Sequence, residues 1–162
     1  MQCATEALLK SGMNARGTTM VVGLVILALG GAALLSPERV MGLLGYTFAS
    51  RTSSAATLGE IRATYGGVFM VMGLFTAFAA INPIANRGRI LFVGLLWLGA
   101  CAGRVFGATV DGSPGLFGWL SAAFELAVGL ALVVASQAAS DAAAVSRAAP
   151  SPSPTAAGAP PA

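Results

Sequence analysis

Six polar side chains lie in or beside apolar stretches of this sequence, and they are the residues that could do chemistry. They are Glu60, Arg62, Tyr65, Arg104, Asp111 and Glu125. A carboxylate and a guanidinium that meet in an apolar place can join two helices, bind the polar part of a ligand, or respond to protons. With three acids and two arginines, the set nearly cancels its own charge, as a purely structural cluster would require.

The rest of the sequence carries few of the residues that enzymes use. Histidine is absent, which excludes histidine general bases and imidazole ligands for zinc or haem. Cys3 and Cys101 are far apart and form no C-x-x-C motif. No catalytic triad, phosphate-binding loop or set of metal ligands is recognisable. We therefore expect no metal and no cofactor, and we favour a non-enzymatic protein.

The composition indicates an integral membrane protein. Of 162 residues, 56% are hydrophobic and only 9% are charged, whereas soluble domains carry roughly 25% charged residues. A membrane helix needs about 20 predominantly apolar residues. Four stretches qualify: Thr18–Leu35, Ile61–Ile81, Ile90–Ala108 and Leu116–Ser136. The predicted fold class is therefore all-α, an integral membrane four-helix bundle. The basic residues are scattered singly, which argues against binding nucleic acid.

The segments between these stretches predict the connections. "SPERVMGLLG" predicts a short interfacial helix after the first span, with Ser36 as its cap and Pro37 at its first position. "INPIANRGR" and "TVDGSPG" predict turns. The expected organisation is an N-terminal segment at 1–17, a transmembrane domain at 18–137 and a disordered Ala/Pro/Ser tail at 138–162. A cleaved signal peptide is the alternative for the first span, and Met13 is an alternative start.

The distribution of basic residues predicts the orientation in the membrane. One side of the predicted bundle receives Lys10, Arg16, Arg87, Arg89 and Arg147, and the other receives Arg39 and Arg51. Positively charged loops favour the cytoplasmic side. We therefore expect both termini in the cytoplasm. The abundance of Ala, Gly and Arg, with a single Lys, is typical of a bacterial source, so the predicted location is the bacterial inner membrane.

Antiparallel spans would bring the six polar residues into the outer half of the bundle. Glu125 would lie near the bilayer midplane, and Arg104 would lie close enough to pair with it. Glycines at helical spacing beside these two residues would let the helices approach closely. The glycines expected to pack helices are Gly66, Gly67, Gly99, Gly103, Gly107 and Gly118.

These motifs together resemble a known family. "EIRATYGG" near the start of the second span, "GR" late in the third, "DG" in the next turn and a lone Glu in the last span all come in order. The sequence from about Val21 to Val134 resembles a bacterial family of four-helix membrane proteins, domain of unknown function 4345. Where the family usually has Asn before the Glu, this chain has Gly59. The resemblance implies the fold, no known activity, and the motif Glu60, Arg62, Tyr65, Gly66, Gly67, Arg104, Asp111, Gly112 and Glu125.

Three functions remain open at this point. The favoured one is an accessory or structural subunit of a membrane complex, whose partners would be other integral membrane subunits. The second is a protein or enzyme that binds a membrane lipid or an isoprenoid-like molecule, with Glu125 and Arg104 at the polar end of its site. The third is a small proton-coupled transporter, although such pumps have near-symmetric dimers and weak charge bias, which this sequence does not suggest.

Overall fold

The described part of the chain forms four long helices and one short helix. The computed structural model describes residues 2–45 and 57–148, with side chains from residue 12 onward. The elements are α1 (Gln2–Leu35), α2 (Pro37–Leu43), the π-helical segment η1 (Arg62–Val68), α4 (Phe69–Ala79), α5 (Arg87–Asp111) and α6 (Gly115–Ala148). The all-α prediction and the short helix after the first span are confirmed.

Within the described ranges, four helices are long and apolar enough to cross a membrane. They are Gly12–Leu35, Thr57–Ala79, Arg87–Asp111 and Gly115–Ala148. The second contains η1 and α4 in one continuous span. Many of their large apolar side chains are exposed, among them Phe78, Phe92 and Phe106. Helices with such outer surfaces suit a lipid environment, where every backbone polar group must be bonded within the segment.

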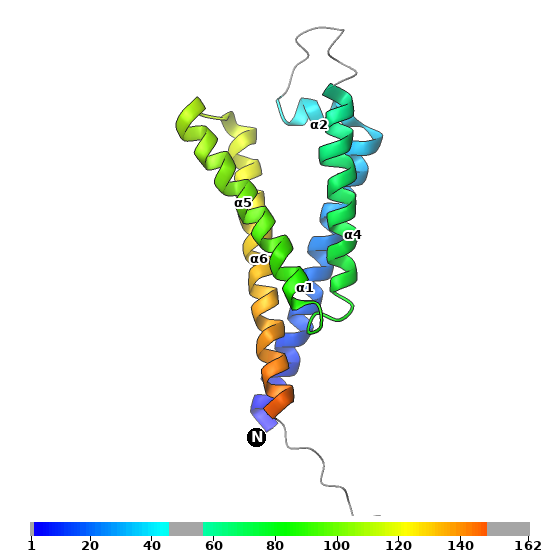
Figure 1. Cartoon of the computed structure of the whole chain (residues 1–162), viewed down its shortest axis with the longest axis vertical. Coiled ribbons are helices and arrows are strands. Elements are labelled where there is room, and N and C mark those ends of the chain that lie inside the picture. Colours follow the sequence, from blue (N-terminus) through cyan, green and yellow to red (C-terminus); the bar gives the residue numbers. More distant parts are fainter. Residues whose placement is uncertain (1, 46–56, 149–162) are drawn as a thin grey trace, which may run out of the picture.

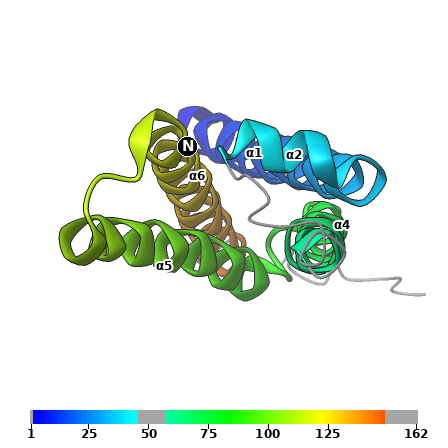
Figure 2. The same ribbon diagram turned by 90° about the horizontal axis from the view of Figure 1, so that it is seen from above.

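The long helices form two antiparallel pairs that diverge along the molecule. In Figure 1, α1 (blue) packs against α4, and α5 (green) packs against α6. Helix α1 also packs against α6 and so joins the pairs. The pairs are close together near the N-terminus and separate toward the end that carries α2 and the α5–α6 turn (Figures 1 and 2). We call these the closed end and the open end.

Glycines at two helix contacts account for the tight pairing. A Cβ on Gly23 of α1 would lie 2.6 Å from the backbone nitrogen of Ala77, and a Cβ on Gly73 of α4 would collide with the backbone of Leu27. On the other pair, a Cβ on Gly94 would lie 3.1 Å from the carbonyl oxygen of Gly129. Without side chains at these positions, the backbones approach closely, as is common where membrane helices pack.

The glycines predicted to pack helices lie mostly elsewhere. Gly66 does lie against α1, since a Cβ there would be 2.7 Å from the Leu34 side chain. A Cβ on Gly99 or Gly103 would meet no atom of the described chain within 4 Å. The closest neighbours of Gly67, Gly107 and Gly118 belong to the same span or its adjoining turn, namely Arg62, Asp111 and Pro114.

The predicted stripe of Gly99, Gly103 and Gly107 packs against no other helix of the described chain, for a geometrical reason. The contact of α5 with α6 runs through Gly94, Leu98 and Arg104. Successive residues of an α-helix are rotated by about 100°, so the stripe lies on the opposite side of α5 from α6.

The end of α6 also differs from the prediction. The helix continues to Ala148, so the expectation of a disordered tail is wrong for residues 138–148; residues 149–162 lie outside the described part. Ala139 and Ala143 are buried, and Ala139 belongs to the same apolar cluster as Ala15 of α1. Alanine has the highest helix propensity, and this packing extends the helix beyond the apolar run.

The two short connections follow the turn residues of the sequence. Pro37 lacks an N–H and begins α2, although Ser36 makes no side-chain capping hydrogen bond there, contrary to the prediction. Helix α5 ends at Asp111, and Gly112 follows with φ 96°, a backbone conformation that glycine adopts readily. This turn brings α6 back beside α5.

Candidate functional site

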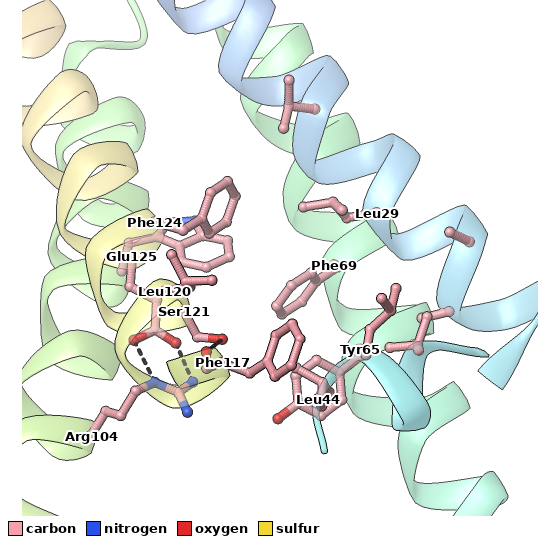
Figure 3. A pocket seen from close by; sticks show the side chains of 16 residues that line it. Leu29, Leu44, Tyr65, Phe69, Arg104, Phe117, Leu120, Ser121, Phe124 and Glu125 are labelled. Atoms are coloured by element: carbon pink, nitrogen blue, oxygen red, sulfur yellow. Dashed lines mark hydrogen bonds and ion pairs between the residues drawn. The ribbon is translucent and has the colours of Figure 1, made fainter. Parts of the chain in front are cut away.

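Arg104 and Glu125 form an ion pair between α5 and α6. The Arg104 Nε donates to Glu125 Oε2 at 3.1 Å, and Nη2 donates to Oε1 at 2.5 Å. Both hydrogen bonds are drawn as dashed lines in Figure 3. The Glu125 side chain is 7% exposed and that of Arg104 is 28% exposed. Two parallel charge-assisted hydrogen bonds fix the geometry of both side chains.

The position of the pair follows from the register of the two helices. The turn after Asp111 is short, so a residue late in α5 must lie beside one early in α6. On α6, Ala122, Glu125, Val128 and Gly129 are buried, which is the three-to-four spacing of one helical face. Glu125 therefore points toward the interior, where an unpaired carboxylate would be costly.

A cavity of about 510 Å³ lies beside this pair, where the two helix pairs diverge. Its wall includes residues of α1, α2, η1, α4, α5 and α6. Among the described lining residues, Tyr65, Arg104, Ser121 and Glu125 are polar, and the others are aliphatic or aromatic. In Figure 3, Tyr65 and Phe117 extend from opposite walls into the space between the pairs. The cavity is thus mainly apolar, with its charges confined to one place.

Four aromatic rings in contact connect the two walls. The ring centroids of Tyr65 and Phe69 are 5.6 Å apart, those of Phe69 and Trp97 are 5.2 Å apart, and those of Trp97 and Phe124 are 5.5 Å apart. The last two contacts have the edge-to-face arrangement that aromatic pairs favour. Because η1, α4, α5 and α6 each contribute one ring, this aromatic row holds the diverging pairs together beside the cavity.

Trp97 carries an unsatisfied polar atom. The residue is only 4% exposed, and it lines the cavity. Its Nε1 is the one buried side-chain nitrogen or oxygen that lacks a hydrogen-bond partner in the described part of the chain. An indole N–H can only donate, and leaving a buried donor unpaired costs about 1–3 kcal/mol. Such an atom needs an explanation.

The π-helical segment η1 places Tyr65 on the cavity wall. Segments of this kind are rare and occur often at functional sites. On one side of η1, Gly66 lies against Leu34. Arg62 Nε donates to the Leu34 carbonyl oxygen at 3.4 Å, near the end of α1 where carbonyl groups lose their helical partners. These contacts attach η1 to α1 and so fix the position of Tyr65.

The structure brings together three of the six predicted polar residues. Tyr65, Arg104 and Glu125 all line the cavity. Glu60 is exposed and accepts a hydrogen bond from Thr64 Oγ1 at 3.0 Å. Asp111 is exposed at the end of α5. Arg104–Glu125 is the one ion pair among the residues whose side chains are described, so the expected larger cluster does not form there.

The aromatic residues that line the cavity were not predicted from the sequence. Phe117, Ser121 and Phe124 follow one another at spacings of four and three along α6, and Tyr65 and Phe69 are four apart. That spacing was visible as one helical face. No local sequence pattern indicated that these two helix faces meet across a cavity, because the distance between them depends on how far the helix pairs diverge. As for metals, no group of three or more His, Cys, Asp or Glu that could hold an ion occurs among the described residues.

These observations define the class of protein. A chain with four long apolar helices and a buried ion pair between two of them is a polytopic membrane protein. It belongs to the family described as domain of unknown function (DUF4345), whose sequence model matches residues 15–136. All residues that line the cavity fall within this range. Neither the curated proteins nor the solved structures include a significant match.

Proposed function

We propose that this protein binds an amphiphilic molecule of the membrane, of the lipid or isoprenoid type, in the cavity between its helix pairs. The observation that carries this proposal is an apolar cavity of about 510 Å³ that has a buried ion pair on its wall. Ligand sites commonly have volumes of about 300–1,000 Å³, apolar linings and a few polar groups. The apolar part of the ligand would lie along the aromatic row, with its polar part near Arg104 and Glu125.

A purely structural role accounts for less of the geometry. Joining α5 to α6 explains the ion pair, since the two residues lie on neighbouring helices. It does not explain why the two helix pairs diverge beside the ion pair, or why Tyr65 and Ser121 line the same cavity. A structural subunit that docks against other helices needs only outer apolar faces. A proton-carrying role is also less well supported, because both oxygens of Glu125 accept hydrogen bonds from Arg104.

The proposal includes a location and a class of partner. The protein would lie in the inner membrane of a bacterium, with both termini in the cytoplasm, as the basic residues suggest. Its ligand would enter from the bilayer, because lipid-facing side chains surround the bundle. We assign the protein no reaction.

The test is to identify amphiphiles that purify with the full-length protein. Ala32 lines the cavity and is exposed within it, so Ala32→Phe should fill part of the volume. Ala123 on α6 is also exposed but is not part of the cavity wall, so Ala123→Phe is the matched control. We expect mass spectrometry of wild type and Ala123→Phe to show one amphiphile enriched over the bulk membrane extract. Ala32→Phe should lose it. Equal lipid profiles in all three proteins would contradict the proposal.

A further inference from the structure

We infer that the ligand is an uncharged amphiphile with an oxygen acceptor that binds the Trp97 N–H. The inference rests on the proposed function and specifies the chemical class of the ligand. Two separate features of the cavity carry it: the charge balance of its wall, and the one buried donor that lacks a partner.

The charge balance argues against an ionic ligand. Among the lining residues that the structure describes, Arg104 is the single cation and Glu125 the single anion. They bind each other through two hydrogen bonds, so the described part of the wall is neutral. An anionic head would have to compete with Glu125 for Arg104, and a cationic head would have to compete with Arg104 for Glu125. Either would leave an uncompensated charge in a poorly solvated place, which is strongly unfavourable.

The unpaired N–H argues against a plain hydrocarbon. Trp97 Nε1 is buried and has no acceptor in the described part of the chain, and other atoms of the Trp97 side chain line the cavity. Once a small turn of the indole brings the N–H to the cavity surface, a carbonyl, ether or hydroxyl oxygen of a bound molecule would satisfy it, whereas an alkyl chain would not. Sites built to hydrogen-bond a ligand group discriminate strongly against analogues that lack this group.

The spacing along α5 sets the length of the ligand. Trp97 precedes Arg104 by seven residues, which is two helical turns and about 10 Å along the axis. Both side chains therefore lie on one side of α5, and both belong to the wall of the cavity. A molecule that reaches the ion pair and the indole must be elongated, with polar atoms at two levels. Phe69 and Phe124 flank the indole ring and provide an apolar surface for the apolar part of the ligand.

The experiment uses the two tryptophans of the chain as separate reporters. Trp119 is 45% exposed and does not line the cavity. In the full-length Trp119→Phe protein, Trp97 is the only indole; in Trp97→Phe, Trp119 is. Decylbenzoquinone, an uncharged quencher with two carbonyl oxygens, is titrated into both proteins in a nonionic detergent. We expect saturable quenching of Trp97, and only the linear quenching of an exposed indole for Trp119.

Competition with three probes of equal chain length then tests whether the site prefers an uncharged head group. Decanol should relieve the quenching of Trp97, whereas decyl phosphate and decyltrimethylammonium should need at least about tenfold higher concentrations. If a charged probe competes as well as decanol, the ligand is ionic and the inference fails while the proposed function stands. If Trp97 is quenched only linearly and no probe changes this, the inference also fails. The proposed function would still stand after linear quenching of Trp97 if the wild type retains an enriched amphiphile and Ala32→Phe loses it.

Discussion

At the scale of single residues, the Arg104–Glu125 pair has to be considered as a unit. Each charge is tolerated in an apolar place because the other neutralises it, and because two hydrogen bonds hold them together. Within the described residues, the pair is also the only ionic feature of the cavity wall. It therefore contributes to stability and to any binding of a polar group, and a single substitution cannot separate these roles.

A double-mutant cycle separates them. Arg104→Leu and Glu125→Leu should each lower the stability in detergent by about 3–5 kcal/mol, because each breaks a buried ion pair by removing one of its two charges. The double substitution should recover most of this loss, since two apolar side chains need no desolvation. Thermal unfolding of the four proteins measures the coupling. If the double variant is as unstable as the sum of the singles, each residue depends on another partner.

The same double variant also distinguishes an ion pair that only joins two helices from one that binds the ligand. If it folds well and loses the enriched amphiphile, the ion pair binds the ligand. If it folds well and retains the amphiphile unchanged, the pair only joins α5 to α6. Arg104→Lys is an informative intermediate, because lysine keeps the charge but cannot form the same planar two-point contact.

At the scale of elements, the glycines of α1 and α4 determine how closely the first pair packs. A Cβ on Gly73 would collide with Leu27 and lie 2.7 Å from the carbonyl oxygen of Gly23. These are backbone atoms, so relief requires the whole helix to move. Gly99 of α5 offers a matched comparison, because a Cβ there would meet no described atom within 4 Å.

We therefore expect opposite effects from the same substitution at these two positions. Gly73→Ala should destabilise the protein by about 1–3 kcal/mol, as overpacking does in well-packed cores. Gly99→Ala should be neutral or stabilise by up to about 1 kcal/mol, since alanine favours the helix and loses less backbone entropy on folding. The midpoints of thermal unfolding in detergent report both. A clear loss of stability in Gly99→Ala would mean that the surface around Gly99 packs against another molecule.

The elements themselves were largely predictable from sequence, and so was one contact. Apolar stretches of span length define the four helices because a bilayer leaves few alternatives. The Arg104–Glu125 pair was predictable because a short turn forces neighbouring antiparallel helices into one register. The side of α5 that faces α6 could not be predicted from Gly99 and Gly103, because a stripe of small residues does not show which side of its helix meets a neighbouring helix.

The cavity was not predictable for a related reason. It exists because α1–α4 and α5–α6 pack tightly within each pair and diverge at one end, and this depends on long-range contacts such as those of Gly23 and Gly94. Trp97 shows the same limit. In the sequence it is an apolar residue in an apolar span. Only its burial beside a cavity, without an acceptor, distinguishes it.

At the scale of the whole molecule, the two ends differ in charge as well as in shape. Helix α5 begins and α6 ends at the closed end (Figure 1), and Arg87, Arg89 and Arg147 lie in the first and last turns of these helices. The open end carries Arg39 of α2 and Arg62 of η1. The excess of arginine favours a cytoplasmic closed end. In that orientation the cavity widens toward the outer leaflet, and an uncharged amphiphile would enter from there.

Cysteine labelling in intact cells tests this orientation. In a protein with Cys3→Ser and Cys101→Ser, single cysteines are introduced at Ser113 in the α5–α6 turn and at Gly88 near the start of α5. Both positions are exposed, and a Cβ on Gly88 would meet nothing within 4 Å. A membrane-impermeant maleimide should label Ser113→Cys in intact spheroplasts, and Gly88→Cys only after lysis. The reverse pattern would place the open end in the cytoplasm. The cavity would then face the inner leaflet, and its ligand would have to be a molecule of that leaflet, although the ion pair and the unpaired Trp97 donor would select the same uncharged chemistry.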